Sequence, residues 1–165
     1  MLKPQDLLVT LKLAASPNEN WTYQLLAESL GMSKAEVHAA VKRSEAAGLL
    51  RGRAVRRNAL MELLAHGVKY AFFVRPGATS RGMPTAAIAP PLATLLSQTA
   101  EGPVWPDPEG TARGFAIAPL YKSATIAARN DAKLYELLAL TDAIRIGLPR
   151  EAKLAVEQIE ARLKR

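Results

Sequence analysis

The sequence predicts an α+β protein in which helices at both ends of the chain enclose a small β region. Apolar residues recur at helical spacing through most of residues 1–66 and again from Tyr121 onward. Between them, residues 76–119 hold eight of the eleven prolines and five of the ten glycines, a composition that breaks helices and favours turns between short strands. We therefore expect an N-terminal domain over residues 1–66 and a small α+β domain over residues 67–165, in which C-terminal helices cover the β region.

Residues 22–48 have the pattern of two short helices joined by a tight turn, preceded by a supporting helix that starts near Pro4. Two such helices cross at roughly 90–120° and need a small residue at their contact, a residue tolerant of positive φ in the turn, and an apolar anchor on the second helix. Ala27, Gly31 and Val37 occupy these places. The stretch is therefore expected to form a helix-turn-helix.

Capping residues mark the ends of both helices. Thr22 can cap the first helix, and Gly31 can end it. Ser33 and Glu36 have the spacing of a capping box, in which each side chain binds the other residue's backbone N–H. The second helix is thus predicted over about residues 33–47.

The second helix separates an apolar stripe from a small, basic outer face. Val37, Ala40 and Val41 form the inward stripe. The residues predicted to face outward are Lys34, Ala35, His38, Ala39, Lys42 and Arg43.

These residues resemble the bacterial winged helix-turn-helix regulators, in the broad group that includes the multiple-antibiotic-resistance and arsenic-resistance repressors. The resemblance covers about residues 3–75. In that family the second helix enters the DNA major groove, and a following β-hairpin wing touches the backbone or the minor groove. The resemblance implies groove-facing positions for Ser33, Lys34, Ala35, His38, Ala39 and Lys42. This sequence departs from the family at the wing, because residues 51–57 are too few for a long hairpin.

The positive charge of the chain is concentrated in its first half. The net charge is +7; residues 1–84 carry 12 Lys and Arg against 6 Asp and Glu, whereas residues 85–165 carry 10 against 9. Such clustering favours a polyanionic partner, and nucleic acid in particular. The cations between residues 34 and 57 are Lys34, Lys42, Arg43, Arg51, Arg53, Arg56 and Arg57.

The middle of the chain is expected to form a small sheet. Asn58 can cap a helix that runs to His66, and residues 68–74 are rich in β-branched and aromatic residues, which predicts a mostly buried strand. A short helix is expected at about residues 91–98. Residues 107–110 fit a type I turn flanked by strands at residues 104–105 and 111–117.

One segment of the middle region has the composition of an anion-binding or effector-binding loop. Residues 75–85 contain two arginines, three hydroxyl side chains and two glycines, of which Arg75, Thr79, Ser80 and Arg81 are the candidate ligands. The alternative is an ordered surface loop packed on the sheet.

Two helices are predicted at the end of the chain. Asn130 or Asp131 can cap the first, Gly147 can end it, and the second runs over residues 150–164. Their apolar stripes can cover either the sheet of the same chain or a second subunit. We expect a homodimer through residues 120–165, with Leu137, Ile144, Ile159 and Leu163 as its candidate contacts.

The composition excludes several other classes. The chain has no cysteine, so disulfides and the usual structural zinc sites are excluded, and no catalytic or cofactor fingerprint occurs. We expect no enzyme activity, no metal and no cofactor. No apolar run approaches a membrane span and no signal-peptide pattern is present, which predicts a cytoplasmic protein.

The leading interpretation is a sequence-specific regulator that binds double-stranded DNA as a dimer, with a protein partner or a small effector at its second half. The alternative is a protein-interaction module, such as an antitoxin or a complex subunit, in which DNA binding is secondary or lost. Neither interpretation defines the operator, the effector or the sign of regulation.

Overall fold

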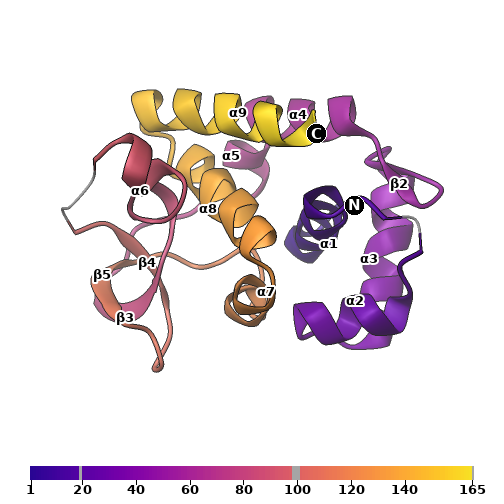
Figure 1. Ribbon diagram of the computed structural model, residues 1–165, viewed down its shortest axis with the longest axis horizontal. Helices are drawn as coiled ribbons and strands as arrows, with labels where there is room; N and C mark the ends of the chain where they lie inside the picture. Colours follow the sequence, from indigo (N-terminus) through magenta and orange to yellow (C-terminus); the bar gives the residue numbers. More distant parts are fainter. Residues whose placement is uncertain (19, 98–100, 165) are drawn as a thin grey trace.

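The computed structural model describes residues 1–18, 20–97 and 101–164. It is an α+β structure, as predicted. Helices α1, α2 and α3 lie at one end, the strands β3 to β5 lie at the other, and α8 lies between them (Figure 1). Its helices are α1 (Pro4–Ala15), α2 (Tyr23–Leu30), α3 (Lys34–Ala46), α4 (Arg57–His66), α5 (Val68–Ala71), the 3-10 helix η1 (Ala86–Ile88), α6 (Leu92–Leu95), α7 (Ala124–Asn130), α8 (Ala132–Ile146) and α9 (Pro149–Leu163). Its strands are β1 (Leu50–Arg51), β2 (Ala54–Val55), β3 (Thr79–Pro84), β4 (Pro103–Pro106) and β5 (Ala112–Ala116).

Helices α2 and α3 form at the predicted positions because local caps hold their ends. The Thr22 hydroxyl accepts the backbone N–H of Leu25 at 3.1 Å, and Gly31 ends α2 with φ of 65°. Ser33 and Glu36 form the predicted capping box, with N···O distances of 3.1 and 2.7 Å. The start of α3 is therefore set by interactions within four residues of chain.

Helix α1 supports this pair from behind through a polar and an apolar seam. Val37, Ala40 and Val41 of α3 are all buried, as predicted, and α1 packs against α3. The Thr10 hydroxyl donates to the Ser44 hydroxyl at 3.2 Å inside this contact. The inner side of α3 is thus fully used by the fold.

A very short hairpin follows α3. Leu50 pairs with Val55 and Arg51 with Ala54 in an antiparallel β1–β2 ladder, and Gly52 turns between them with φ of 61°. The predicted shortness of this hairpin is confirmed. Helix α4 begins at Arg57, so the predicted cap at Asn58 is wrong, because Asn58 already lies inside the helix.

Strands β3, β4 and β5 form a small closed barrel in which each strand pairs with the other two. β3 is antiparallel to both partners, and β4 and β5 run parallel to each other. The predicted strands at residues 104–105 and 111–117 are confirmed as β4 and β5, whose bounds differ from the prediction by one residue at each end. The turn between them also forms, since the Gly110 N–H donates to the Asp107 carbonyl at 3.0 Å.

The predicted strand over residues 68–74 is wrong. The chain forms helix α5 there, with Val68 buried and α5 packed on α8, while Tyr70 and Phe73 are 74% and 63% exposed. Tertiary packing of one apolar side chain overrides the β propensity of its neighbours. The third strand of the barrel is β3, which comes from the segment predicted as a loop.

The two predicted domains share one hydrophobic core. A single cluster of buried side chains extends from Leu7 in α1 to Leu163 in α9. An ion pair between Lys12 Nζ and Asp131 Oδ2, at 2.6 Å, joins α1 to the start of α8. The boundary at residue 66 therefore does not separate two independent cores.

The C-terminal helices bury their stripes within their own chain. Helix α8 packs on α1, α5, α7, α9 and η1, and α9 packs on α8 and α4. The predicted helix ends hold, with Asp131 as the cap of α8 and Gly147 as its left-handed end. The candidate dimer contacts cannot meet a second subunit, because none of the four is more than 4% exposed: Leu137, Ile144, Ile159 and Leu163.

A buried polar cluster fixes α8 to the barrel side of the molecule. The Asp142 carboxylate accepts hydrogen bonds from the Thr85 hydroxyl, the Trp105 indole N–H and the Arg145 guanidinium, each at 2.7 Å. Arg145 also donates to the Phe72 carbonyl at 2.8 Å. All four side chains that interact here are buried.

Within residues 1–18, 20–97 and 101–164, no helix is long and apolar enough to cross a membrane.

Candidate nucleic-acid interface

The outer face of α3 is exposed along its length. The inward stripe leaves Ser33, Lys34, Ala35, His38 and Lys42 exposed to solvent, and Ala39 is half-buried. The short side chains of the two alanines project little from this face, while the lysines supply positive charge. The structure thus brings together six of the positions that the sequence assigned to DNA.

A row of rings connects this face to the hairpin, and sequence reasoning missed it. The His38 ring lies 5.0 Å from the Tyr23 ring, which lies 5.5 Å from the Trp21 ring. The Arg53 guanidinium lies over Trp21 at 4.0 Å, within the range of a cation–π contact. The spacing of Trp21, Tyr23 and His38 in the sequence gives no period that would have predicted this row.

Hydrogen bonds from side chains to backbone carbonyls hold the hairpin in this place. The Trp21 indole N–H donates to the Arg53 carbonyl at 3.2 Å, and the Arg53 guanidinium donates to the Trp21 carbonyl. Arg56 donates from Nη1 to the Gly48 carbonyl at 2.9 Å. The hairpin therefore has a fixed position beside α2 and α3.

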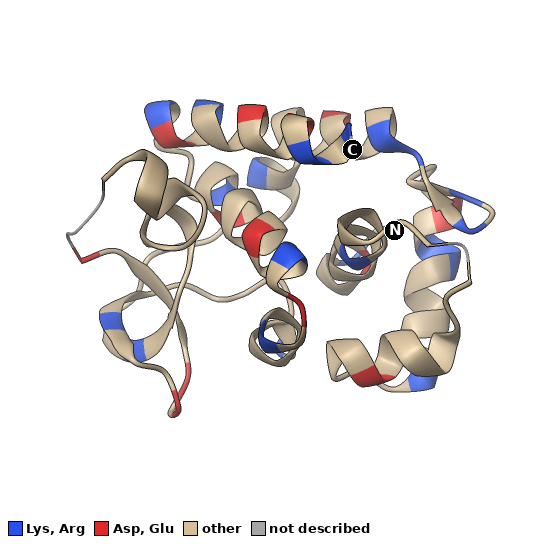
Figure 2. Cartoon of the chain, in the orientation of Figure 1, with Lys and Arg blue, Asp and Glu red and all other residues tan. Residues whose placement is uncertain are grey.

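The predicted basic residues of the hairpin region are all exposed. Arg51 lies on β1, Arg53 in the turn, and Arg56 and Arg57 at the start of α4. Lys and Arg of α3 and of the hairpin gather at one end of the molecule (Figure 2). These cations and the outer face of α3 form what we call the basic end, defined by Lys34, His38, Lys42, Arg51, Arg53, Arg56 and Arg57.

Arg43 differs from its predicted outward position. Its guanidinium makes three contacts of 2.8 to 3.1 Å with the carboxylate of Asp6, a residue of α1 with no exposed surface. The hydrogen bonds to Asp6 raise the pKa of Arg43. Arg43 therefore compensates a buried charge in the α1–α3 contact, and we leave it out of the basic end.

Two acidic residues lie on α3 among these cations. Glu45 pairs with Lys42, with 3.6 Å between Oε2 and Nζ. The Tyr121 hydroxyl donates to Glu36, and this hydrogen bond and those from Ser33 lower the pKa of Glu36 to about 2. Glu36 is thus ionised at neutral pH.

Most of the predicted anion-binding loop, residues 79–84, forms a strand. Thr79, Ser80 and Arg81 lie in β3, whose residues alternate between two faces, and Arg75 lies outside the strand beside the Phe73 ring. The segment forms a strand because its backbone pairs with both β4 and β5. Ser80 therefore lies on the opposite face of β3 from Thr79 and Arg81, so the four candidate ligands do not share one face.

The strand pairing instead places two arginines opposite each other. Arg81 of β3 is the direct cross-strand partner of Arg113 of β5, and both are exposed. Like charges at directly opposed positions destabilise a strand pair.

We expect Arg113→Glu to stabilise the fold by about 0.5–1 kcal/mol in urea unfolding at low salt, an effect that shrinks in 1 M NaCl. Arg75→Glu is the matched control, and equal stability of Arg113→Glu and the wild type would contradict the prediction.

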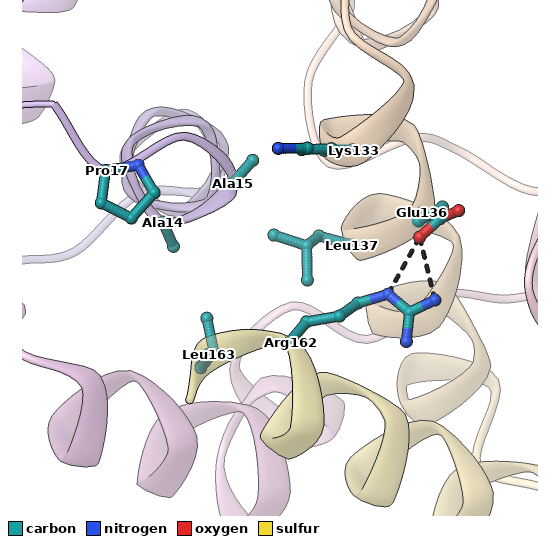
Figure 3. Close-up of a pocket in the computed structure, with 8 residues that line it drawn as sticks. All are labelled: Ala14, Ala15, Pro17, Lys133, Glu136, Leu137, Arg162 and Leu163. Atoms are coloured by element: carbon teal, nitrogen blue, oxygen red, sulfur yellow. Dashed lines mark hydrogen bonds and ion pairs between the residues drawn. The ribbon is translucent and has the colours of Figure 1, made fainter. Parts of the chain in front are cut away.

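A hollow of about 250 Å³ lies between the end of α1 and helices α8 and α9 (Figure 3). Leu137 and Leu163 form its apolar wall, and Lys133 lies across from Ala15. Glu136 and Arg162 pair at its edge at 2.9 Å. None of the predicted effector residues lines it.

Within the part of the chain that the structure describes, no group of three or more His, Asp or Glu residues could hold a metal ion. Comparison of the chain with protein-family models, with curated proteins and with solved structures found no match.

Proposed function

We propose that the first 66 residues act as a winged helix-turn-helix and that the protein is a sequence-specific transcriptional regulator that binds double-stranded DNA. The observation that carries this proposal is the division of α3. Its apolar stripe and Arg43 are used by the fold, whereas its outer face is exposed, low and cationic. In proteins of this kind such a helix enters the major groove.

The side chains at the start of α3 suit the reading of base edges. In a recognition helix the N-terminal residues contact the bases, and here these are Ser33, Lys34, Ala35 and His38. Lys34 can donate to guanine, and Ala35 can contact a thymine methyl group. The capping box supports this role because it fixes the backbone at the end that would meet the bases.

The hairpin suits contacts with the phosphate backbone. Its two strands have only two residues each, so it reaches a short distance beyond α3. Arg51 and Arg56 are exposed beside it. The row of rings from Trp21 to His38 holds the hairpin at a fixed position relative to α3. Phosphate contacts of this kind orient a protein on the duplex, while base contacts specify the sequence.

The test is the salt dependence of binding to a fluorescein-labelled 30-base-pair duplex of random sequence. We expect Lys34→Ala and Lys42→Ala each to lower the magnitude of the log K against log salt slope by about 0.9, because on a random-sequence duplex each ammonium group contacts a phosphate, and its loss releases one fewer condensed counterion. Both lysines are exposed, so thermal unfolding should not change.

Lys153→Ala provides the matched control for this experiment. Lys153 is exposed on α9, which packs on α8 and α4, and its removal changes the net charge by the same amount. Its slope should equal that of the wild-type protein. If Lys34→Ala and Lys42→Ala both keep the wild-type slope, as Lys153→Ala should, DNA binding lies elsewhere on the protein. A wild-type protein that binds no duplex would reject the proposal.

A protein-interaction module, such as an antitoxin or a complex subunit, is the second candidate. Exposed Tyr70 and Phe73 favour it, because large apolar side chains at the surface often mark interaction sites. Protein docking at these residues would show little dependence on salt. The homodimer and the small effector stay predictions, and a dimer must use contacts other than the four buried stripe residues.

A further inference from the structure

A segment of the C-terminal half lies against the start of α3. Tyr121, between β5 and α7, donates its hydroxyl hydrogen to Oε1 of Glu36 in the first turn of α3. The second carboxylate oxygen of Glu36 accepts the N–H of Ser33 at 2.7 Å. Both oxygens are therefore occupied, and the carboxylate is held in one orientation.

Helix α7 keeps this segment in a fixed position relative to the helix pair. A Cβ built on Gly31, in the turn between α2 and α3, would lie only 3.1 Å from Ile126 of α7, so the two elements are in close contact. Asn130, at the end of α7, donates to the Ser29 carbonyl of α2 at 3.0 Å. The other side of α7 packs on α8. Helix α7 is thus held between α2 and α8, and Tyr121 lies three residues before its start.

Lys122 adds a positive charge at the same place. Its side chain is exposed, and its ammonium lies 5.7 Å from the centre of the Tyr121 ring. The charge of Lys122 acts on Glu36 and helps to keep that carboxylate ionised. At the N-terminal end of α3, Glu36 would repel a DNA phosphate, and Lys122 supplies the attraction that offsets this repulsion.

We propose that the DNA-binding surface is shared between the two halves of the chain, with Lys122 as a phosphate contact beside the N-terminal end of α3 and Tyr121 as the residue that positions Glu36. This inference rests on the proposed function of α3. It assigns to the C-terminal half a direct part in DNA binding, which the nearly neutral charge of that half does not suggest.

The experiment uses the full chain and the same random-sequence 30-base-pair duplex. We expect Lys122→Ala to lower the magnitude of the salt slope by about 0.9, as for Lys34→Ala, while Lys153→Ala leaves it unchanged. Thermal unfolding of Lys122→Ala should match the wild type, since this side chain is exposed. An unchanged slope for Lys122→Ala overturns the inference, whatever the affinity.

Tyr121→Phe tests the positioning role separately. This change removes one hydrogen bond and keeps the ring, so the pKa of Glu36 should rise from about 2 toward its ordinary value of 4.5 in a carbon-detected NMR titration. Duplex affinity should fall, because a Glu36 carboxylate that Tyr121 no longer holds in one orientation is free to approach the DNA phosphates that it repels. The salt slope should keep its wild-type value because no phosphate contact is lost. Wild-type affinity in Tyr121→Phe overturns the positioning role.

The two proposals fail in distinguishable ways. If Lys34→Ala lowers the slope and Lys122→Ala does not, the basic end binds DNA without the C-terminal half, and only the shared surface is rejected. If the wild-type protein binds no duplex, the proposed function of α3 is rejected together with the inference.

Discussion

Replacement of Asp142 by alanine is expected to destabilise the fold by about 3–5 kcal/mol, because removal of one partner of a buried ion pair leaves the other charge uncompensated. Asp142 is 1% exposed, and the Arg145 side chain is 5% exposed. The loss also leaves the Thr85 hydroxyl and the Trp105 indole N–H without their acceptor. Urea unfolding followed by tryptophan fluorescence measures the effect directly, since Trp105 belongs to the cluster.

A second variant at this position separates charge from hydrogen bonding. Burial raises the pKa of the Asp142 carboxyl, and Arg145 and the two neutral donors oppose that shift. Asp142→Asn removes the countercharge of Arg145 but keeps a hydrogen-bond acceptor on a side chain of the same size. Because the acceptor is kept, Asp142→Asn should destabilise the fold less than Asp142→Ala. The exposed ion pair between Lys164 and Glu160 provides the control, because Glu160→Ala should cost well under about 1 kcal/mol. A loss below about 1 kcal/mol in Asp142→Ala would contradict the role of the cluster.

Gly82→Ala is expected to destabilise the fold by about 3 kcal/mol or more, at or beyond the upper end of ordinary overpacking. A Cβ at Gly82 in β3 would overlap the carbonyl oxygen of Trp105 in β4 and would lie 2.7 Å from its carbonyl carbon. This neighbour is backbone, which cannot move aside without breaking the β3–β4 pairing. The three-stranded barrel closes so tightly that only glycine fits here.

Gly77→Ala is the matched control for this prediction. Gly77 lies just before β3, and its nearest neighbour would be the Ala116 carbonyl oxygen at an ordinary 3.5 Å. We expect a thermal midpoint close to that of the wild type. Equal midpoints for Gly82→Ala and Gly77→Ala would mean that the barrel is open at this position.

The helix pair of the candidate interface was predictable because its determinants are local. Thr22, Gly31, Ser33 and Glu36 act within four residues of their own positions, and α3 forms where they predict it. The exposure of Lys34 followed from the helical period, as did the burial of the stripe.

Arg43 lay outside the reach of the same reasoning. The helical period placed it on the outer face, but Asp6 is 37 residues away in the sequence, and its buried carboxylate draws the guanidinium inward. The long, flexible side chain of arginine can reach a partner beyond its own face of the helix.

The barrel was only partly predictable, for a related reason. Strands β4 and β5 follow from the turn at residues 107–110, a local signal. Strand β3 contains Gly82 and Pro84, which are poor strand formers, and its backbone is ordered by pairing with partners far along the chain. Residues 68–74 had the stronger β propensity, yet Val68 is buried against α8 as part of a helix.

The sequence by itself determined the α+β class, the caps and inward stripe of α3, the shortness of the hairpin and the concentration of positive charge in the first half. Only the tertiary structure decided that both halves share one core, that the C-terminal stripes are buried within the chain, and that Tyr121 meets Glu36 across 85 residues. The physical reason is the distance along the chain over which each kind of interaction acts. Caps, turns and helical faces depend on neighbours within a few residues, whereas buried ion pairs, strand partners and contacts between helices depend on which distant surfaces the whole chain packs together.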